Sequence, residues 1–303
     1  MRSRTVDLGG PVHFADFGGA GPTMVLVHGL GGSHLNWLAV GPALAARARV
    51  LAPDLAGFGR TPLAGRSAHV RANAQLLDRF IDAVAEGPAT LIGNSMGGLL
   101  AMMEAARQPE KVSRLVLVGA AQPRPPGTRF DPVVALTFAA YAVPGLGEQF
   151  MRWRAARRGP EGLVRDTLQL VCADPGRVPA EVVAAHVALA RDRMDRMPWG
   201  NQAFLEAARS IVFTLARRRE VHAMIGRIAA PALLVQGTRD RLVSLAASRA
   251  TAALRPDWTL TVLEGIGHVP QLETPERFVA TVTGWLDGHV GRAADGVSRA
   301  ARS

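Results

Sequence analysis

The sequence of 303 residues predicts an α/β fold with a mostly parallel central sheet and an inserted helical segment. Short apolar runs rich in β-branched residues alternate with longer helical patterns, as expected for a parallel sheet covered by helices on both faces. The strand pattern stops near residue 121 and resumes near residue 232, which predicts a helical insertion within one domain. The apolar fraction of 48% is typical of globular proteins, and a chain of this length buries a sufficient core without disulfides or metals.

Seven segments are expected to form strands. The first, residues 12–19, is expected at an antiparallel edge of the sheet, whereas the others have the continuous apolar character of buried parallel strands. These others are residues 23–29, 49–54, 89–95, 114–120, 231–237 and 258–265. Pro109 is expected to end the helix that follows residues 89–95, and Thr274 and Pro275 supply the N-cap and first position of the last helix.

The predicted organisation has three parts. Residues 1–121 and 228–288 form the α/β core, and residues 122–227 form the helical insertion. The insertion is rich in alanine, methionine and arginine and is interrupted by several prolines. Residues 289–303 have no apolar periodicity, so they are expected to form a loose C-terminal tail.

The charge balance bears on possible partners. The chain has 35 basic and 25 acidic residues, a net charge of +10. Lys111 is the only lysine, so the positive charge is almost entirely arginine, and only residues 151–158 form a dense basic cluster. We expect no nucleic-acid binding and interpret this cluster as a solvated helix face. Attraction of anionic substrates or lipid surfaces stays open, although the sequence does not favour contact with a membrane surface.

Cysteine usage and hydropathy bear on the compartment. Cys172 is the only cysteine, and the first ten residues lack the apolar core of a signal peptide. The longest uncharged candidate for a membrane span, residues 132–147, is too short and contains Pro144. These features predict a soluble, cytoplasmic protein. The sequence does not decide whether residues 132–147 pack inside or form an apolar lid, nor does it give the oligomeric state.

The most specific motif is Gly93-Asn94-Ser95-Met96-Gly97, which matches the pattern G-x-S-x-G. It follows a predicted strand and precedes a helical pattern, so Ser95 is expected at a sharp strand-to-helix turn at the carboxyl edge of the sheet. The flanking glycines let neighbouring backbone approach closely. We therefore predict that Ser95 is a nucleophile.

A serine hydroxyl needs an adjacent base, and His268 is the best-placed histidine. It lies on a glycine-bracketed loop between the last predicted strand and the last helix. Asp240 follows residues 231–237, and we predict that it orients the imidazole and stabilises its protonated form. The chain order Ser95, Asp240, His268 then corresponds to nucleophile, acid and base.

Two backbone N–H groups are expected to stabilise the developing oxyanion. One belongs to Met96 at a helix N-terminus, and the other to Leu30 in the glycine-rich loop after residues 23–29. His28 is expected to brace this loop by hydrogen bonds. His28, Gly29 and Ser33 are also candidates for the substrate pocket.

Together these motifs resemble the α/β-hydrolase superfamily, in its branch with a serine nucleophile and a helical cap. The resemblance covers about residues 20–120 and 230–288. It rests on the segments VLVHGLGG, PDLAGFGRT, LIGNSMGG, LLVQGTRD and GIGHVPQLETPERF in this order. It implies the α/β-hydrolase fold, with residues 122–227 as a cap over the pocket, and it implies that Asp54 belongs to a structural turn.

Within this family, Ser95 favours hydrolysis of carboxylic esters. Epoxide hydrolases and haloalkane dehalogenases use an aspartate at this position, and epoxide hydrolases add cap tyrosines, whereas Tyr141 is the only tyrosine here. The expected substrate is a small ester with an apolar acyl or alcohol part, in a pocket lined partly by Phe138, Trp199 and Val269. The chain has no metal-ligand or phosphate-loop pattern, so we expect no metal and no cofactor.

Three alternatives stay open. The segment GNSMGG also resembles the elbow of meta-cleavage C–C bond hydrolases, but the proline usual in the loop after His28 and the tryptophan usual after His268 are missing. A thioesterase would use the same catalytic residues, with the arginines of residues 151–158 meeting a phosphorylated carrier. A ligand receptor on this fold would not require the full catalytic set.

Overall fold

The computed structural model describes residues 1–128, 131–197 and 199–300, with side chains described as far as residue 288. Within these residues, eight strands form one sheet in the order β1-β2-β4-β3-β5-β6-β7-β8. The pairs β1–β2 and β2–β4 are antiparallel, and the other five pairs are parallel. The strands are β1 (Arg2–Asp7), β2 (Pro11–Gly18), β3 (Thr23–Val27), β4 (Arg49–Pro53), β5 (Ala89–Asn94), β6 (Val112–Val118), β7 (Ala232–Gly237) and β8 (Thr259–Leu263).

The strand β1 is one that the sequence analysis did not predict. Five of its six residues are polar and five are exposed, so it has no apolar face that a periodicity could reveal. It pairs with β2 along its whole length, from Arg2 opposite Asp16 to Asp7 opposite Pro11. Backbone hydrogen bonds to β2, rather than burial of side chains, therefore hold this edge strand in place.

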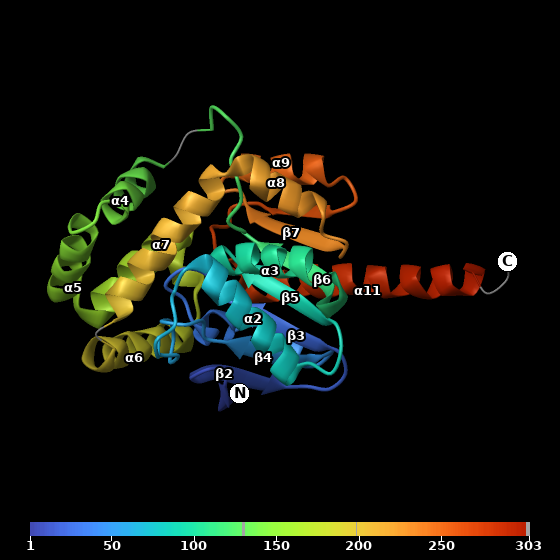
Figure 1. Ribbon diagram of the computed structural model, residues 1–303, viewed down its shortest axis with the longest axis horizontal. Coiled ribbons are helices and arrows are strands. Elements are labelled where there is room, and N and C mark those ends of the chain that lie inside the picture. Colours follow the sequence, from blue (N-terminus) through green and yellow to red (C-terminus); the bar gives the residue numbers. More distant parts are fainter. Residues whose placement is uncertain (129–130, 198, 301–303) are drawn as a thin grey trace.

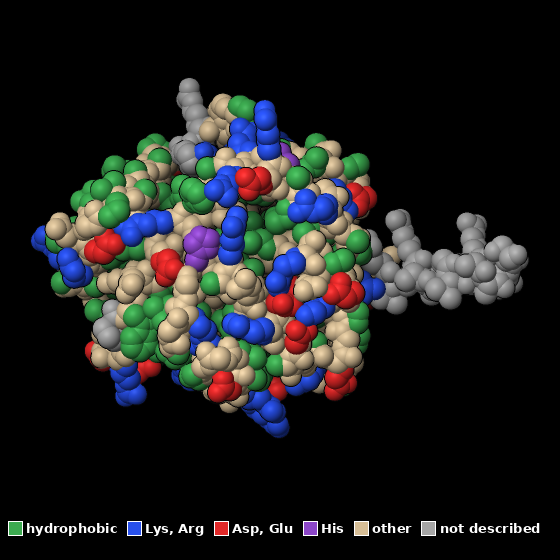
Figure 2. Space-filling model, viewed as in Figure 1, with side chains coloured by type: hydrophobic (Ala, Val, Ile, Leu, Met, Phe, Trp, Pro, Cys, Tyr) green, Lys and Arg blue, Asp and Glu red, His purple; other side chains and the backbone are tan. Residues whose placement is uncertain are grey.

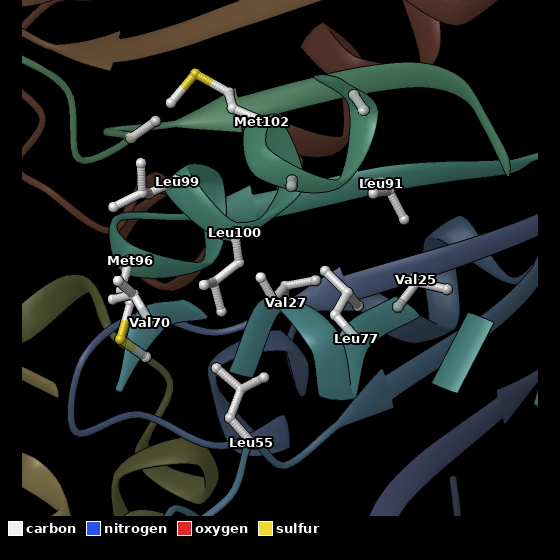
Figure 3. Close-up of a cluster of buried hydrophobic side chains, with 14 of the residues drawn as sticks. Val25, Val27, Leu55, Val70, Leu77, Leu91, Met96, Leu99, Leu100 and Met102 are labelled. Carbon is white, nitrogen blue, oxygen red and sulfur yellow. The ribbon is translucent and has the colours of Figure 1, made fainter. Parts of the chain in front are cut away.

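Helices cover both faces of the sheet (Figure 1). The helices of the core are α1 (Gly41–Leu44), α2 (Val70–Val84), α3 (Met96–Arg107), α9 (Leu245–Leu254), α10 (Pro270–Glu273) and α11 (Pro275–Ala300). One buried cluster joins α2 and α3 to one face of the sheet, and a second joins α1 and α11 to the other. Figure 3 shows Leu100 of α3 and Leu77 of α2 pointing toward Val27 of β3.

The stretch between β6 and β7 is helical. It contains α4 (Pro132–Ala142), α5 (Leu146–Val171), α6 (Ala180–Arg196), α7 (Gly200–Ala216) and α8 (Arg218–Gly226). Helices α4 to α7 lie at one side of the sheet in Figure 1, whereas α8 contacts α3 and adds Val221 and Ile225 to the core cluster. The helix α5 has a kink at Gly159, just before Pro160. The exact limits of the cap stay a prediction.

An arginine of α6 links the helical stretch between β6 and β7 to the core. Arg193 of α6 donates from Nη1 to the Gly59 carbonyl oxygen (2.9 Å) and from Nη2 to that of Gly57 (3.0 Å). Both glycines have positive φ angles, in the turn that follows β4. Because charge-assisted hydrogen bonds are strong when partly shielded from water, this contact fixes α6 over the turn.

The C-terminal residues differ from the expectation of a loose tail. Helix α11 continues through residues 289–300 to Ala300, and its end extends away from the rest of the molecule (Figure 1). A helix without apolar periodicity can continue from a packed first half, because each added residue only extends a hydrogen-bonded ladder that already exists.

No single helix in the described part of the chain is both long and apolar enough to cross a bilayer. The pair α4 and α5 meets the length and composition requirement only when the two helices are taken together, and they are bent by 117°.

Candidate active site

Ser95 lies between β5 and α3 in a strained turn. Its φ of 56° and ψ of −117° are rare for a residue other than glycine. A Cβ atom at Gly97 would lie 2.1 Å from the Val27 carbonyl oxygen, and one at Gly93 would lie 2.4 Å from the Gly97 carbonyl oxygen. Only glycine fits these two positions, so the spacing G-x-S-x-G follows from close backbone packing around the turn.

His268 and Asp240 form a hydrogen-bonded pair. The His268 Nδ1 and the Asp240 Oδ2 are 2.8 Å apart, and 3% or less of either side chain is exposed. Asp240 follows β7 and His268 follows β8, so neighbouring parallel strands deliver both residues to the same edge of the sheet. A carboxylate at Nδ1 orients the ring and leaves Nε2 as the nitrogen that can accept a proton.

Because Gly119 has no side chain, it leaves room for the pair of His268 and Asp240. It follows β6, which lies between β5 and β7, so it separates the end of the Ser95 strand from that of the Asp240 strand. A Cβ atom at this position would lie 2.9 Å from the His268 Nδ1 and 3.1 Å from the Asp240 Oδ2. The role of Gly119 is not evident from the sequence, since a glycine can follow a strand for many reasons.

The Asp240 carboxylate accepts four hydrogen bonds. Its Oδ1 accepts from the backbone N–H groups of Leu242 (2.8 Å) and Val243 (2.9 Å), and its Oδ2 accepts from His268 and from the Gln236 Nε2 (2.9 Å). Four donors of this kind fix the plane of the carboxylate. The carboxylate is therefore held rigidly against the imidazole.

Gln236 connects Asp240 to a buried polar network. Its Oε1 accepts from the Ser248 Oγ (2.7 Å), which in turn accepts from the Gln122 Nε2 (2.8 Å). Gln236 is completely buried, and Gln122 and Ser248 are nearly so. These three residues come from three separate parts of the chain. This network could not be predicted from the sequence, because the residues around a glutamine at the end of a strand do not indicate which distant side chain it contacts.

Three hydrogen bonds hold the loop that carries His268. The His268 N–H donates to the Val171 carbonyl oxygen at the end of α5 (2.7 Å), and the His268 carbonyl oxygen accepts from the Asn94 Nδ2 (3.1 Å). Asn94 directly precedes Ser95, so this bond links the loop to the Ser95 turn. In addition, the buried Glu273 carboxylate accepts from the Gly267 N–H (2.7 Å).

The loop after β3, which contains Leu30, lies against Ser95. Gly29 to Gly32 form a tight turn in which the Gly32 N–H donates to the Gly29 carbonyl oxygen (3.1 Å) and Gly31 has a φ of 73°. Leu30 is the first central residue of this turn. A Cβ atom at Gly29 would lie 3.1 Å from the Ser95 Cβ, so the turn lies against Ser95.

The other predicted donor is the backbone N–H group of Met96. Met96 is the first residue of α3, and the first N–H groups of a helix have no acceptor within the helix. The N–H groups of Leu30 and Met96 therefore both belong to the backbone around Ser95. The arrangement can stabilise negative charge that develops beside the serine hydroxyl.

His28 and Ser33, two of the predicted pocket residues, are buried and support the loop by hydrogen bonds. His28 is fully buried, its Nδ1 bonds to the Gly29 carbonyl oxygen (2.8 Å), and its Nε2 accepts from the Leu55 N–H (3.0 Å). Burial lowers the pKa of His28 to about 4, so it is neutral at pH 7. Ser33 is buried and caps a short 3₁₀ helix, His34–Trp37.

Two of the other predicted pocket residues, Val269 and Phe138, pack in hydrophobic clusters that include helices between β6 and β7. Val269 is buried in a cluster with residues of α5 and α10, and Phe138 packs in a cluster around Tyr141 of α4. Leu30 contacts that same cluster. Trp199 is half-buried, and its indole N–H has no partner among the described residues.

A cavity of about 540 Å³ lies beside Asp240. It is lined by Arg124, Asp131, Gln169, Cys172, Ala173, Arg239, Asp240, Arg241, Leu242 and Ser244. None of the predicted apolar pocket residues is among these, so this polar cavity differs from the apolar pocket that the sequence predicted. Burial, with the nearby carboxylates of Glu273 and Asp174, raises the pKa of the Cys172 thiol to about 12, so this cysteine is no nucleophile.

A buried cluster of His13, His34 and Asp54 stabilises the turn after β4. Their ligand atoms all lie within 4.8 Å of one another, a spacing that could hold a metal ion. Both rings contact the Asp54 carboxylate at 2.8–3.0 Å, and the N–H groups of His34 and Arg60 also donate to it. Although burial opposes ionisation, these bonds lower the pKa of the Asp54 carboxyl below its usual range. Because these atoms already satisfy one another, the cluster is structural.

Comparison with known proteins identifies relatives over most of the chain. A family model described as alpha/beta hydrolase fold matches residues 22–275. A pimeloyl-[acyl-carrier protein] methyl ester esterase from Aromatoleum aromaticum is 31% identical over 84% of this chain and 94% of that protein. A 2-hydroxymuconate semialdehyde hydrolase from a Pseudomonas species is 30% identical over 88% of each chain. A solved structure of a membrane phospholipase A is 27% identical, with a TM-score of 0.71 over 95% of this chain and 86% of that chain.

Proposed function

Because the chain belongs to the α/β-hydrolase fold family, we propose that it is a serine hydrolase that cleaves carboxylic esters with an apolar acyl or alcohol part. The observation that carries the proposal is the 2.8 Å contact between the His268 Nδ1 and the Asp240 Oδ2, at the sheet edge where the strained Ser95 turn also lies. Strain in a buried turn is retained where a function requires it. Gly93 and Gly97 allow the close backbone packing that this turn requires.

In the proposed acylation step, the Ser95 Oγ attacks the carbonyl carbon of the ester while its proton passes to the His268 Nε2. The N–H groups of Leu30 and Met96 stabilise the oxyanion of the tetrahedral intermediate. His268 then returns the proton to the alkoxide oxygen as the bond between carbon and this oxygen breaks. The alcohol leaves, and an ester remains between the acyl group and Ser95.

In the deacylation step, a water molecule replaces the alcohol. His268 takes one proton from this water as its oxygen attacks the acyl carbon, and it returns the proton to the Ser95 Oγ when the acyl–enzyme bond breaks. Asp240 stabilises the imidazolium in both steps and keeps its own charge. The products are a carboxylic acid and free enzyme.

The preference for apolar substrates rests on what surrounds the Leu30 loop. Phe138, Tyr141 and Phe204 of the cap form an aromatic cluster that also contacts Leu30. A wall of this kind favours an apolar acyl or alcohol group over a charged one. The esterase from Aromatoleum aromaticum is named for an ester substrate, which agrees with this choice.

Hydrolysis of a C–C bond is a second candidate function. It is favoured by the 30% identity to the 2-hydroxymuconate semialdehyde hydrolase and by the segment GNSMGG. Val269 after His268, and Gly31 and Gly32 in the Leu30 loop, depart from the pattern usual in those enzymes. We therefore place ester hydrolysis first.

The test is hydrolysis of p-nitrophenyl esters from acetate to laurate by the wild type and by Ser95→Ala. We expect the wild type to turn over several esters and Ser95→Ala to lose at least about a thousandfold in kcat. Ser113→Ala, on β6, is the matched control and should keep wild-type activity. Folded wild-type protein that cleaves no ester would refute the proposal, and 2-hydroxymuconate semialdehyde would then be tested.

A further inference from the structure

The cap carries an exposed apolar face. We define it by Val133, Leu136, Val143, Leu146 and Trp153, each at least half exposed, with Leu136 at 75%. Residues 132–147 contain no charged side chain. Hydrophobic side chains gather over α4 in Figure 2. Single exposed apolar residues are ordinary, but a contiguous group on one helix and the start of the next marks an interaction surface.

The helix α4 is apolar on its inner side as well. Val134 and Tyr141 are buried, and Tyr141 packs on Leu205 and Ala208 of α7. The helix therefore cannot turn its outer face inward without exposing an equally apolar inner face. A helix that is apolar all round requires a partner on each side, and among the described residues only the inner side of α4 has one.

Positive charge lies beside the apolar face. Arg152 and Arg157 of α5 are exposed, and the Arg157 guanidinium lies 5.6 Å from the centre of the Trp153 ring. Two other arginines of this helix pair with Asp166, whereas neither Arg152 nor Arg157 forms a salt bridge with any described residue. Exposed aromatic and aliphatic side chains next to unpaired arginines suit a surface that is apolar inside and anionic outside.

We propose that this face docks on a lipid bilayer containing acidic phospholipids, with α4 in the interfacial plane and Arg152 and Arg157 among the headgroups. The complementarity of charge selects this occupant. With a net charge of +10, the chain is attracted by an anionic surface, whereas two copies of it repel each other. The arginines add to the apolar contact, and the combination of the two makes such binding stable.

Docking through α4 would bring the region around Ser95 close to the bilayer. Phe138 and Tyr141 on its inner side join the cluster that contacts Leu30. Docking would therefore place the Ser95 region one helix away from the lipid in which apolar esters dissolve. This consequence rests on the proposed function, but the docking itself does not.

Flotation with vesicles tests the docking without any measurement of turnover. The full-length protein is mixed with vesicles of phosphatidylcholine alone or of phosphatidylcholine with phosphatidylglycerol. We expect the wild type to bind the anionic vesicles and not the neutral ones. Leu136→Gln should lower the partition coefficient about tenfold, and the double variant Arg152→Gln/Arg157→Gln about 25-fold. Leu136 is largely exposed, so these substitutions leave the core intact.

Two matched variants on α9 serve as controls. Leu254→Gln and Arg249→Gln also replace an exposed leucine and an exposed arginine, but on a core helix that packs against β7 and β8 and is not part of the exposed apolar face. Both should bind vesicles like the wild type. The proposal is overturned if the wild type ignores anionic vesicles or if the α9 variants lose as much binding as the α4 variant. It is also overturned if light scattering finds a dimer that Leu136→Gln dissociates, since a second copy would then cover the face.

Discussion

Replacing Gln236 by leucine tests whether the network behind Asp240 matters to catalysis. The Gln236 Nε2 donates to Oδ2 of Asp240 (2.9 Å), the same oxygen that faces the His268 Nδ1. Leucine has a similar volume but no donor, so this variant removes one of the four hydrogen bonds to the carboxylate. The two backbone donors to Oδ1 remain and keep Asp240 in its place.

The size of the effect follows from the bond that is lost. A hydrogen bond to a charged group contributes roughly 1.5–3 kcal/mol, which corresponds to about 10- to 100-fold in rate if all of it acts in the transition state. The imidazolium forms only during the reaction, so the position of Oδ2 matters most at that stage. We therefore expect kcat/KM of Gln236→Leu to fall about 10- to 100-fold.

The assay measures kcat/KM on the best p-nitrophenyl ester, together with urea unfolding, for the wild type, Gln236→Leu and Ser248→Ala. Ser248→Ala breaks the same network at its bond to the Gln236 Oε1, without removing any donor to Asp240. Both variants should lose stability, but only Gln236→Leu should lose most of its rate. Equal losses of rate in both variants, or full activity in Gln236→Leu, would refute the reasoning.

Three other predictions follow from single contacts. Gly119→Ala places a methyl group 2.9 Å from the His268 Nδ1, so kcat should fall at least about tenfold, with unfolding followed in parallel by circular dichroism. Arg193→Met removes two partly buried hydrogen bonds between α6 and the turn after β4, so urea unfolding should report a loss of about 2 kcal/mol. A completely buried Glu104 has its pKa raised to about 7 by burial, so the folded state binds more protons than the unfolded state between about pH 4.5 and 7. As the pH rises through this range, the free energy of unfolding of the wild type should therefore fall by up to about 3 kcal/mol relative to that of Glu104→Gln. Urea unfolding at pH 4.5 and at pH 8 measures this change. The same change in the free energy of unfolding for both proteins would contradict the prediction.

The sequence by itself determined the α/β hydrolase fold and where its main strands lie. Buried parallel strands are continuous apolar runs, and the Ser95 turn has a glycine pattern that only close backbone packing requires, so both signals are local. The positions of Asp240 and His268 were also predictable, since parallel strands deliver their carboxyl ends to one edge. Their catalytic roles stay a prediction until the variants are measured.

Only the tertiary structure decided which residues surround these positions. Gly119 and Gln236 reach Asp240 from different strands, and no periodicity within either strand identifies such a partner. His28 is fully buried and supports its loop. Its Nε2 accepts a hydrogen bond from the Leu55 N–H, so this nitrogen is not free to contact a substrate. The outer face of α4 is exposed because α7 covers only its inner side. The sequence could not predict this exposure, because a buried helix and an exposed one can have the same apolar composition. Local pattern therefore specifies elements and turns, whereas contacts between distant segments depend on how those elements pack.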